Sequence, residues 1–247
     1  MKLYQHTIFL LLCNFATLSS QGNNSNGVQS DLRLVDLYEN IKNKIGKKTY
    51  SNQKIKGTPY FEKTFKLAEV EYFGELITDK IYIRFNAYND EMEIASSPMT
   101  KSSENILIKN NKVFCIIDGK TYRYLGFKED NQPPTVGYLE ELFKGELFSF
   151  YERKFKVYMQ ATVARTSLER SFPARFVEKI QYYYSINNGE INQIKLSKKN
   201  ILNKLKPHSS SIKLFMEKNN SKLKSLKDVV EMFNFIDQLQ LKVYQLK

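Results

Sequence analysis

The segment KVFCIIDGKTYRYLGF, residues 112–127, places the dipeptide Asp118–Gly119 between two runs rich in β-branched and aromatic residues. This dipeptide is typical of a two-residue β-hairpin turn, in which both positions need a positive φ angle. Similar pairs of extended runs surround Lys144–Gly145 and Asn188–Gly189. We expect the glycine of each Asx–Gly pair to have a positive φ angle. Short strands joined by close turns, without helical segments between them, predict an antiparallel sheet.

The pattern of apolar residues changes after residue 196. Residues 81–88, IYIRFNAY, alternate with the period of two that places successive side chains on opposite faces of a strand. Near the C-terminus, apolar residues recur at helical spacing in three groups: Ile201, Leu202 and Leu205; Ile212, Phe215 and Met216; Leu226, Val229, Val230, Phe233 and Ile236. Pro207 ends the first helix, and Ser225 with Asp228 forms a capping pair for the third. Residues 238–247 fit either a continued helix or a last strand.

These patterns predict an α+β fold, with an antiparallel sheet or partly closed barrel followed by a small C-terminal helical module. We divide the chain into a secretory signal peptide (1–21), a polar linker with an N-terminal element (22–52), an antiparallel β domain (53–196) and a basic helical module (197–247). Whether the helices form a separate domain is left open.

The first residues have the form of a secretory leader. Lys2 precedes a short apolar run, and small and polar residues follow it up to Gln21. The run is shorter than a membrane-spanning helix requires. Cys13 follows Leu12 and not a small residue, which argues against a lipid-anchor site. We therefore expect cleavage near Ser20 or Gln21 and an exported protein of the periplasm or the extracellular space, with no transmembrane segment after the leader is removed.

Several segments resemble, in their order, a family of exported bacterial proteins with no assigned activity: GTPYF, FNAYNDEMEI, VFCIIDGKTYRYLGF, GYLEELFKGE, FPARFVEKIQYYY and the closing LSKKNILNKLKPHSSSIKLFMEKNNSKLKSLKDVVEMFNFID. The similarity covers residues 57–237. This chain departs from the family at KLKPHSSS, where typical members read more like LFPDKKKE, so the start of the middle helix follows less directly from the resemblance. The resemblance implies export and carries no catalytic residue.

The charge of the chain is unevenly distributed. The net charge is +12, and residues 195–247 hold twelve lysines against four acidic residues. A surface of this kind is either an ordinary solvated helix face or an attractor of anionic lipid, acidic polysaccharide or an acidic protein. For the second alternative the candidate binding residues are Lys213, Lys218, Lys222 and Lys224. Export argues against a nucleic acid as the partner.

Few residues fit known catalytic or metal-binding chemistry. Beyond the leader there is one cysteine, Cys115, which we interpret as a buried apolar residue without a disulfide, and one histidine, His208, which we interpret as a solvated loop residue. One of each cannot make a zinc site, and no glycine-rich phosphate-binding motif occurs. We therefore predict no catalytic residues, no metal and no cofactor.

Two groups of side chains leave alternatives open. The carboxylates of Asp90, Glu91, Glu93, Glu140 and Glu141 could serve a hydrolase, but we expect Asp90 and Glu91 to face water, and Glu140 and Glu141 to lie on opposite strand faces. The tyrosine pairs Tyr122 with Tyr124 and Tyr182 with Tyr184 could stack on a ligand, but tyrosine is also an ordinary strand residue.

The leading interpretation is an exported, non-enzymatic cell-envelope protein that binds or scaffolds. The alternatives are a peripheral binder of anionic lipid or polysaccharide through the basic helices, and a carboxylate-dependent hydrolase.

Overall fold

The Asp118–Gly119 dipeptide forms the expected turn between β5 (Val113–Ile117) and β6 (Lys120–Phe127) in the computed structural model, which describes residues 55–245. The φ angles of Asp118 and Gly119 are 51° and 76°. Positive φ at both positions gives the turn a twist that matches the twist of the flanking strands. The predicted leader and linker, 1–52, lie outside the described residues.

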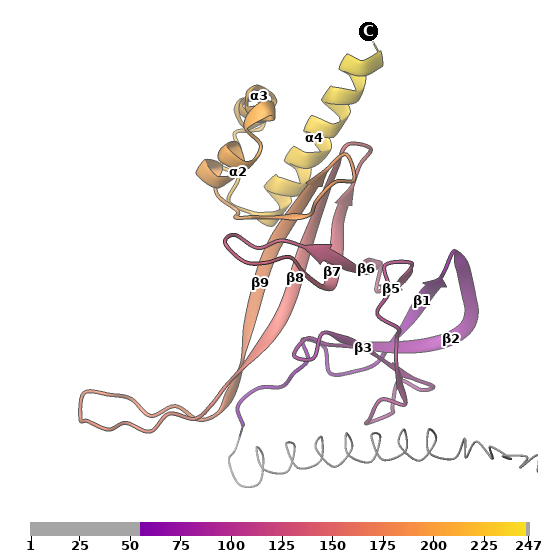
Figure 1. Ribbon diagram of the computed structural model, residues 1–247, viewed down its shortest axis with the longest axis vertical. Coiled ribbons are helices and arrows are strands. Elements are labelled where there is room, and N and C mark those ends of the chain that lie inside the picture. Colours follow the sequence, from indigo (N-terminus) through magenta and orange to yellow (C-terminus); the bar gives the residue numbers. More distant parts are fainter. Residues whose placement is uncertain (1–54, 246–247) are drawn as a thin grey trace, which may run out of the picture. The chain divides into compact units, whose positions relative to one another are not determined.

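Every strand pairs with its neighbours in an antiparallel manner, as the short turns predict. The strand order is β10-β9-β8-β7-β6-β5-β1-β2-β3-β4 (Figure 1). The remaining strands are β1 (Lys66–Tyr72), β2 (Glu75–Asn86), β3 (Glu91–Ala95), β4 (Asn105–Ile106), β7 (Thr135–Lys144), β8 (Phe148–Met159), β9 (Arg175–Ile186) and β10 (Asn192–Ile194).

The prediction of a positive φ angle at Gly189 is wrong. The turn after β9 has its positive φ angles at Asn187 and Asn188, which are 52° and 53°. The N–H of Gly189 closes the turn by donating to the carbonyl of Ile186, at 2.9 Å. Asparagine tolerates this region better than most residues, so the two asparagines occupy the central positions and the glycine follows them.

Two backbone contacts curl the open sheet. Lys128, directly after β6, donates to the carbonyl of Ile191 at 2.8 Å, and its own carbonyl accepts from the N–H of Gln193 at 2.9 Å. The N–H of Lys156 on β8 donates to the carbonyl of Ala87, after β2, at 2.8 Å. Both contacts join parts of the sheet that other strands separate in the pairing order. The architecture is therefore an open sheet with partial closure, in agreement with the predicted fold class.

Three α-helices follow the sheet, as the change of period predicts. They are α2 (Lys198–Lys204), α3 (Ser209–Asn219) and α4 (Leu226–Gln245), with a 3₁₀ turn at Lys206–His208. The hydroxyl of Ser225 accepts from the N–H of Asp228 at 3.1 Å, which confirms the predicted cap. The ambiguous terminal segment continues as helix through Gln245.

The helices bury the side of the sheet formed by β8 and β9, and α4 runs beside these strands in Figure 1. Their apolar stripes pack against Phe148 and Phe150, and the Phe150 ring stacks on Phe233 with 4.9 Å between the centroids. A second apolar cluster, which includes Ile83, Cys115 and Tyr138, lies among β1, β2, β3, β5 and β7. Cys115 is fully buried and has no disulfide, as predicted.

One carboxylate ties α4 to the turn between β7 and β8. Asp237 is 4% exposed and accepts from three backbone N–H groups, those of Glu146 at 3.2 Å, Leu147 at 2.8 Å and Phe148 at 2.9 Å. A buried carboxylate is stable in such a position because several donors replace its lost water. This contact links a helix residue to a turn about 90 positions earlier in the chain.

Candidate functional site

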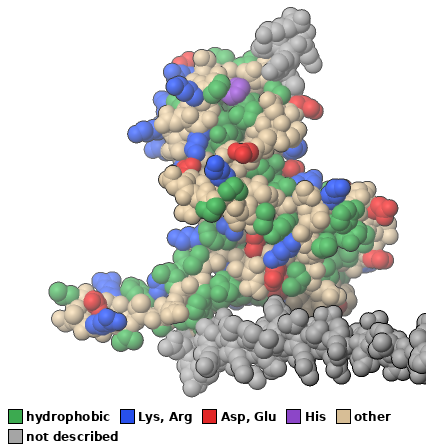
Figure 2. Space-filling model, in the orientation of Figure 1, with side chains coloured by type: hydrophobic (Ala, Val, Ile, Leu, Met, Phe, Trp, Pro, Cys, Tyr) green, Lys and Arg blue, Asp and Glu red, His purple; other side chains and the backbone are tan. Residues whose placement is uncertain are grey.

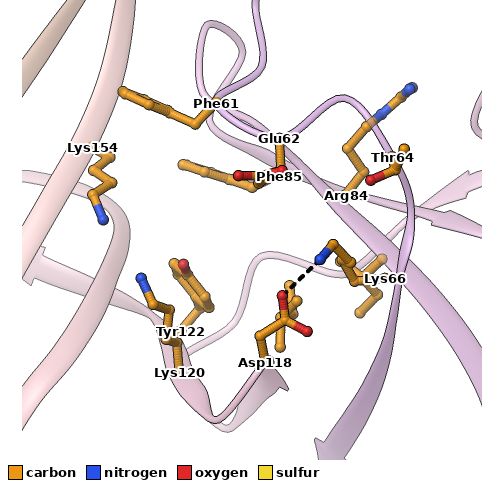
Figure 3. A pocket seen from close by; sticks show the side chains of 12 residues that line it. Phe61, Glu62, Thr64, Lys66, Arg84, Phe85, Asp118, Lys120, Tyr122 and Lys154 are labelled. Carbon is orange, nitrogen blue, oxygen red and sulfur yellow. Dashed lines mark hydrogen bonds and ion pairs between the residues drawn. The ribbon is translucent and has the colours of Figure 1, made fainter.

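A pocket of about 420 Å³ opens where the segment before β1 crosses the curled sheet. Its walls come from residues 61–66, the C-terminal end of β2, the β5–β6 turn with the start of β6, and β8 (Figure 3). Its lining residues are Phe61, Glu62, Thr64, Lys66, Ile83, Arg84, Phe85, Ile117, Asp118, Lys120, Tyr122 and Lys154. The volume lies in the range that small-molecule sites occupy.

The strand periodicity brings lysine and aromatic side chains to the same wall. Lys120 and Tyr122 are two residues apart on β6 and therefore share one face. Lys154 extends toward Lys120 from β8, and the rings of Phe61 and Phe85 form the opposite side of the pocket (Figure 3). The pocket thus combines aromatic surfaces with ammonium groups.

An ion pair stands at one edge of the pocket. The Nζ atom of Lys66 lies 3.0 Å from Oδ2 of Asp118, the first residue of the hairpin turn. The hydrogen bond and the negative charge of Asp118 raise the pKa of Lys66. The turn therefore has a second role besides joining two strands, because it holds the side chain of Lys66 at the rim.

Two glutamates on neighbouring strands lie behind the lysine wall. Glu140 on β7 pairs in register with Glu152 on β8, and both are buried. The Nζ atom of Lys154 bridges them, at 2.6 Å from Glu152 Oε1 and 3.3 Å from Glu140 Oε2. Glu140 also contacts Lys120 Nζ at 3.3 Å and accepts from the Tyr122 hydroxyl at 3.3 Å. The cluster therefore holds two carboxylates and two ammonium groups.

The tyrosines of this cluster remain hydrogen-bond donors. Burial, followed by the negative charge of Glu140, raises the pKa of Tyr122 above its ordinary value. Burial and then the charge of Glu152 raise the pKa of Tyr182. Desolvation and a neighbouring carboxylate both disfavour a phenolate, so neither tyrosine is suited to act as a base.

A buried ion-pair network fixes the segment that covers the pocket. The guanidinium of Arg84 contacts Glu93 at 2.6 Å, donates to the carbonyl of Lys63 at 3.0 Å and stacks between the rings of Tyr60 and Phe65. Its guanidinium points away from the pocket centre in Figure 3. Because these contacts satisfy the Arg84 donors, this residue positions the pocket wall and is not a free ligand contact.

The contacts of Glu140 limit its use as a general acid. A general acid must carry a proton and hold it toward the substrate. Glu140 instead receives three donors, from Lys120, Lys154 and Tyr122. Within residues 55–240, no three side chains of His, Cys, Asp or Glu lie together in a way that could hold a metal ion.

The four predicted binding lysines lie elsewhere. Lys213 and Lys218 are exposed on α3, and Lys222 and Lys224 are exposed in the connection to α4. None of them lines the pocket. The structure does not bring them to the carboxylate cluster, and their role as an anion-binding surface stays a prediction.

Two predictions about polar residues are wrong. Asp90 does not simply face water: it approaches Gly137 and accepts from the N–H of Tyr138 at 3.3 Å, and burial raises its pKa. His208 is not a solvated loop residue, because its ring packs edge-on against Phe148 with 4.9 Å between the centroids. In both cases a distant strand supplies the contact, which the local sequence does not reveal.

The tyrosine pairs divide between the cores and the pocket. Tyr184 is 8% exposed and belongs to the core beneath the helices, and Tyr182 stacks on Phe150 at 5.9 Å. Tyr124 packs edge-on against Tyr138 at 5.2 Å. Tyr122 alone among the four lines the pocket.

Sequence reasoning missed Glu152, Lys154 and Phe61. Glu152 and Lys154 alternate with Arg153 in β8, so their shared face was readable from the period of two. Their approach to Glu140 required the strand register. Phe61 reaches the pocket from an irregular segment, for which no periodic signal exists.

Comparison with protein-family models, curated proteins and solved structures finds no match to this chain. Among the described helices, none has the length and apolar content required to cross a membrane.

Proposed function

We propose that this protein is an exported, non-enzymatic binding protein of the cell envelope, and that its ligand enters the pocket between Phe61 and Lys154. The observation that carries the proposal is the composition of the wall, where aromatic rings lie beside charged groups of both signs and the lysines are paired with carboxylates. Pockets of this kind bind by burying an apolar surface and orienting the ligand through a few polar groups.

The paired charges favour a neutral, hydroxyl-rich ligand over an ion. Lys66 is paired with Asp118, and Lys120 and Lys154 are paired with Glu140. An anion would have to displace one of these carboxylates from its lysine. Hydroxyl groups can instead donate to the carboxylates and accept from the ammonium groups without breaking the pairs. The rings of Phe61 and Phe85 offer flat apolar surfaces for the C–H face of a sugar ring.

The hydrolase alternative receives less support from the same geometry. Glu140 and Glu152 do lie side by side on neighbouring strands, and a glycosidase needs two carboxylates near its substrate. However, the ammonium group of Lys154 lies between them, in the place where a glycosidic oxygen or a water would have to enter. The arrangement therefore supports binding better than bond cleavage.

Titration of neutral oligosaccharides from bacterial envelopes tests the pocket, with calorimetry as the readout. We expect saturable binding that Phe61→Ala and Lys120→Gln each weaken, because these side chains line the pocket. Lys179→Gln is the matched control, since Lys179 is exposed on β9 outside the pocket. Binding that is unchanged in both pocket variants, or no binding by any neutral oligosaccharide, contradicts the proposal. Release of shorter sugars during the titration would instead favour the hydrolase.

Export is tested separately by cell fractionation. The mature protein should begin near Gly22 and appear in the periplasm or the medium. An intact Met1 in cytosolic protein, found by N-terminal sequencing, would contradict export, and a lipid on Cys13 would show an anchored protein instead.

A second candidate function rests on the basic helical module. Lys213, Lys218, Lys222 and Lys224 are all exposed, and none has an ion-pair partner among the described residues. Each lysine near an anionic surface contributes about 1 kcal/mol, within a Debye length of about 8 Å at physiological salt. The surface therefore fits an anionic envelope polymer or lipid.

Co-sedimentation with acidic polysaccharide at low and high salt tests this second candidate. Replacing the four lysines together with Gln should release the protein, and high salt should have the same effect. The matched control replaces four exposed lysines of the sheet domain and of the segment before it, which gives the same change of charge elsewhere: Lys63, Lys80, Lys112 and Lys179. Equal release of the two quadruple variants would show that binding depends on the net charge of the protein and not on a surface formed by these four lysines.

A further inference from the structure

The loop between β8 and β9 extends the hairpin beyond the rest of the sheet as an arm, which we define as residues 160–174 (Figure 1). Two backbone hydrogen bonds of 2.9 Å between Thr162 and Phe172 hold its two sides together. At its base, the backbone of Lys56 bonds to Ala174 at 2.8 Å and to Phe176 at 3.0 Å. The arm is thus anchored at its base, and its distal part projects.

The tip of the arm has an internal structure of its own. The hydroxyl of Ser171 accepts from the N–H of Ala164 at 2.9 Å, and the carboxylate of Glu169 accepts from the N–H of Arg165 at 2.7 Å. These bonds close the loop without using its apolar side chains. Leu168 is 95% exposed, Val163 79% and Phe172 46%. Three apolar side chains are therefore exposed within ten residues, and of these Phe172 contacts the guanidinium of Arg175, 4.8 Å from its ring centroid, whereas Leu168 and Val163 are largely exposed.

Two arginines flank the apolar tip. Arg165 and Arg170 are exposed, and neither guanidinium has an ion-pair partner among residues 55–245. Figure 2 shows hydrophobic and basic side chains on this arm, together with an acidic one, and the two arginines outnumber the one carboxylate, Glu169, between Arg165 and Arg170. A guanidinium can donate two parallel hydrogen bonds to a phosphate group. The arm thus combines an apolar tip with groups that recognise phosphate.

We propose that the arm inserts its tip into an anionic lipid bilayer, with Leu168 and Val163 among the acyl chains and with Arg165 and Arg170 at the lipid phosphates. The shape of the arm favours a bilayer over a protein partner. A stable protein interface buries about 800 Å² on each side, through a broad and complementary surface. A narrow projecting loop offers little such surface, whereas lipids can rearrange around it. Amphipathic segments with basic flanks bind interfaces by burying apolar area and by attraction to anionic lipids.

The absence of tryptophan from the sequence provides a direct test. Leu168→Trp introduces a single tryptophan at the tip, whose emission shifts to shorter wavelength if it enters the acyl region. We expect this shift with vesicles of phosphatidylglycerol and phosphatidylcholine, and a smaller one with phosphatidylcholine alone. Met99→Trp is the matched control, because Met99 is 90% exposed in a different loop. Its emission should not change.

The arginines are tested in the Leu168→Trp background. Because each basic residue near an anionic surface is worth about a fivefold change in affinity, Arg165→Gln with Arg170→Gln should weaken binding roughly 25-fold. An unchanged affinity would overturn the assignment of the arginines. Sedimentation with vesicles but no shift for Leu168→Trp would place the contact elsewhere, for example on the basic helices, and would overturn the proposal. A shift that appears without vesicles and grows with protein concentration would show contact between copies and would also overturn it.

Discussion

Asp237 and Gly145 lie so close that a Cβ atom on Gly145 would stand 2.5 Å from the carboxylate of Asp237. The absence of a side chain at Gly145 lets this carboxylate reach the three backbone N–H groups that follow it in the turn. The φ angle of Gly145 lies outside the left-handed region, so the backbone conformation does not require a glycine at this position. The close approach of Asp237 is what requires it. Helix α4 and the β7–β8 turn are thereby joined at one point.

Substitution of Gly145 should therefore destabilise the protein. Gly145→Ala forces Asp237 away, and at least one buried N–H group then loses its acceptor, which costs about 1–3 kcal/mol. Gly126→Ala is the matched control, because a Cβ there meets its nearest atoms at ordinary contact distances of 3.9 and 4.0 Å. Urea denaturation of both variants measures the difference. Equal midpoints would mean that the carboxylate moves aside without cost.

His208 should make stability depend on pH. Burial lowers its pKa below the ordinary value of 6.5, because the protonated ring is poorly solvated beside Phe148. A histidine whose pKa is lower in the folded than in the unfolded state contributes its full stabilisation above pH 6.5. This contribution is lost as the pH falls from 6.5 through the pKa of the folded state. His208→Gln should flatten this part of the curve between pH 7.5 and 5. Parallel curves for the two proteins, from thermal melts across this range, would contradict the assignment.

Lys154 should be energetically coupled to Glu140 and Glu152, the two glutamates that it bridges. Lys154→Met leaves two buried carboxylates facing each other and should cost at least about 1 kcal/mol. Glu152→Gln in the same chain removes one of the two charges and should recover part of the loss. A double-mutant cycle on the free energy of unfolding measures this coupling. Additive effects would show that Lys154 does not bridge the pair.

Substitutions in the Asn187–Asn188 turn should change the stability of the protein according to how well each residue tolerates a positive φ angle. Asn188→Val places a β-branched residue at a φ angle of 53° and should destabilise the protein by about 1–2 kcal/mol. Asn188→Gly accepts the same angle and should be nearly neutral, apart from losing the 2.8 Å contact with Lys144 Nζ. Similar stability of the two variants would show that the backbone angle does not limit this turn.

The fold was largely accessible from the sequence because its signals are local. The period of two, the Asx–Gly turns and the helical spacing after residue 196 each depend on residues within one element. The curling contacts of Lys128 and Lys156 were not accessible, because they join backbone groups that carry no sequence signal. Asp237 was equally hidden, since its partners lie about 90 residues away.

The site was less accessible, because it depends on one irregularity in a strand. Counting outward from the β7–β8 turn without interruption places Glu141 opposite Glu152. A register shift between Glu141 and Phe143 moves Glu140 into that place instead. Such a bulge turns one set of side chains to the other face of the sheet. The bulge therefore decides that Glu140, and not Glu141, is the partner of Glu152, and no motif in the sequence reveals this.

The strands at the two ends of the sheet affect the tendency of the protein to aggregate at high concentration. The last strand at one end, β4, has two residues, and the last strand at the other end, β10, has three. Lys128 already bonds to the outer side of β10, through Ile191 and Gln193. Long unpaired strand edges are templates on which other chains add and fibres grow. Within residues 55–245 the two terminal strands are too short to act as such a template, but β10 covers only Tyr182–Tyr184 of β9, so residues 177–181 of β9 are a part of the sheet where another strand could add.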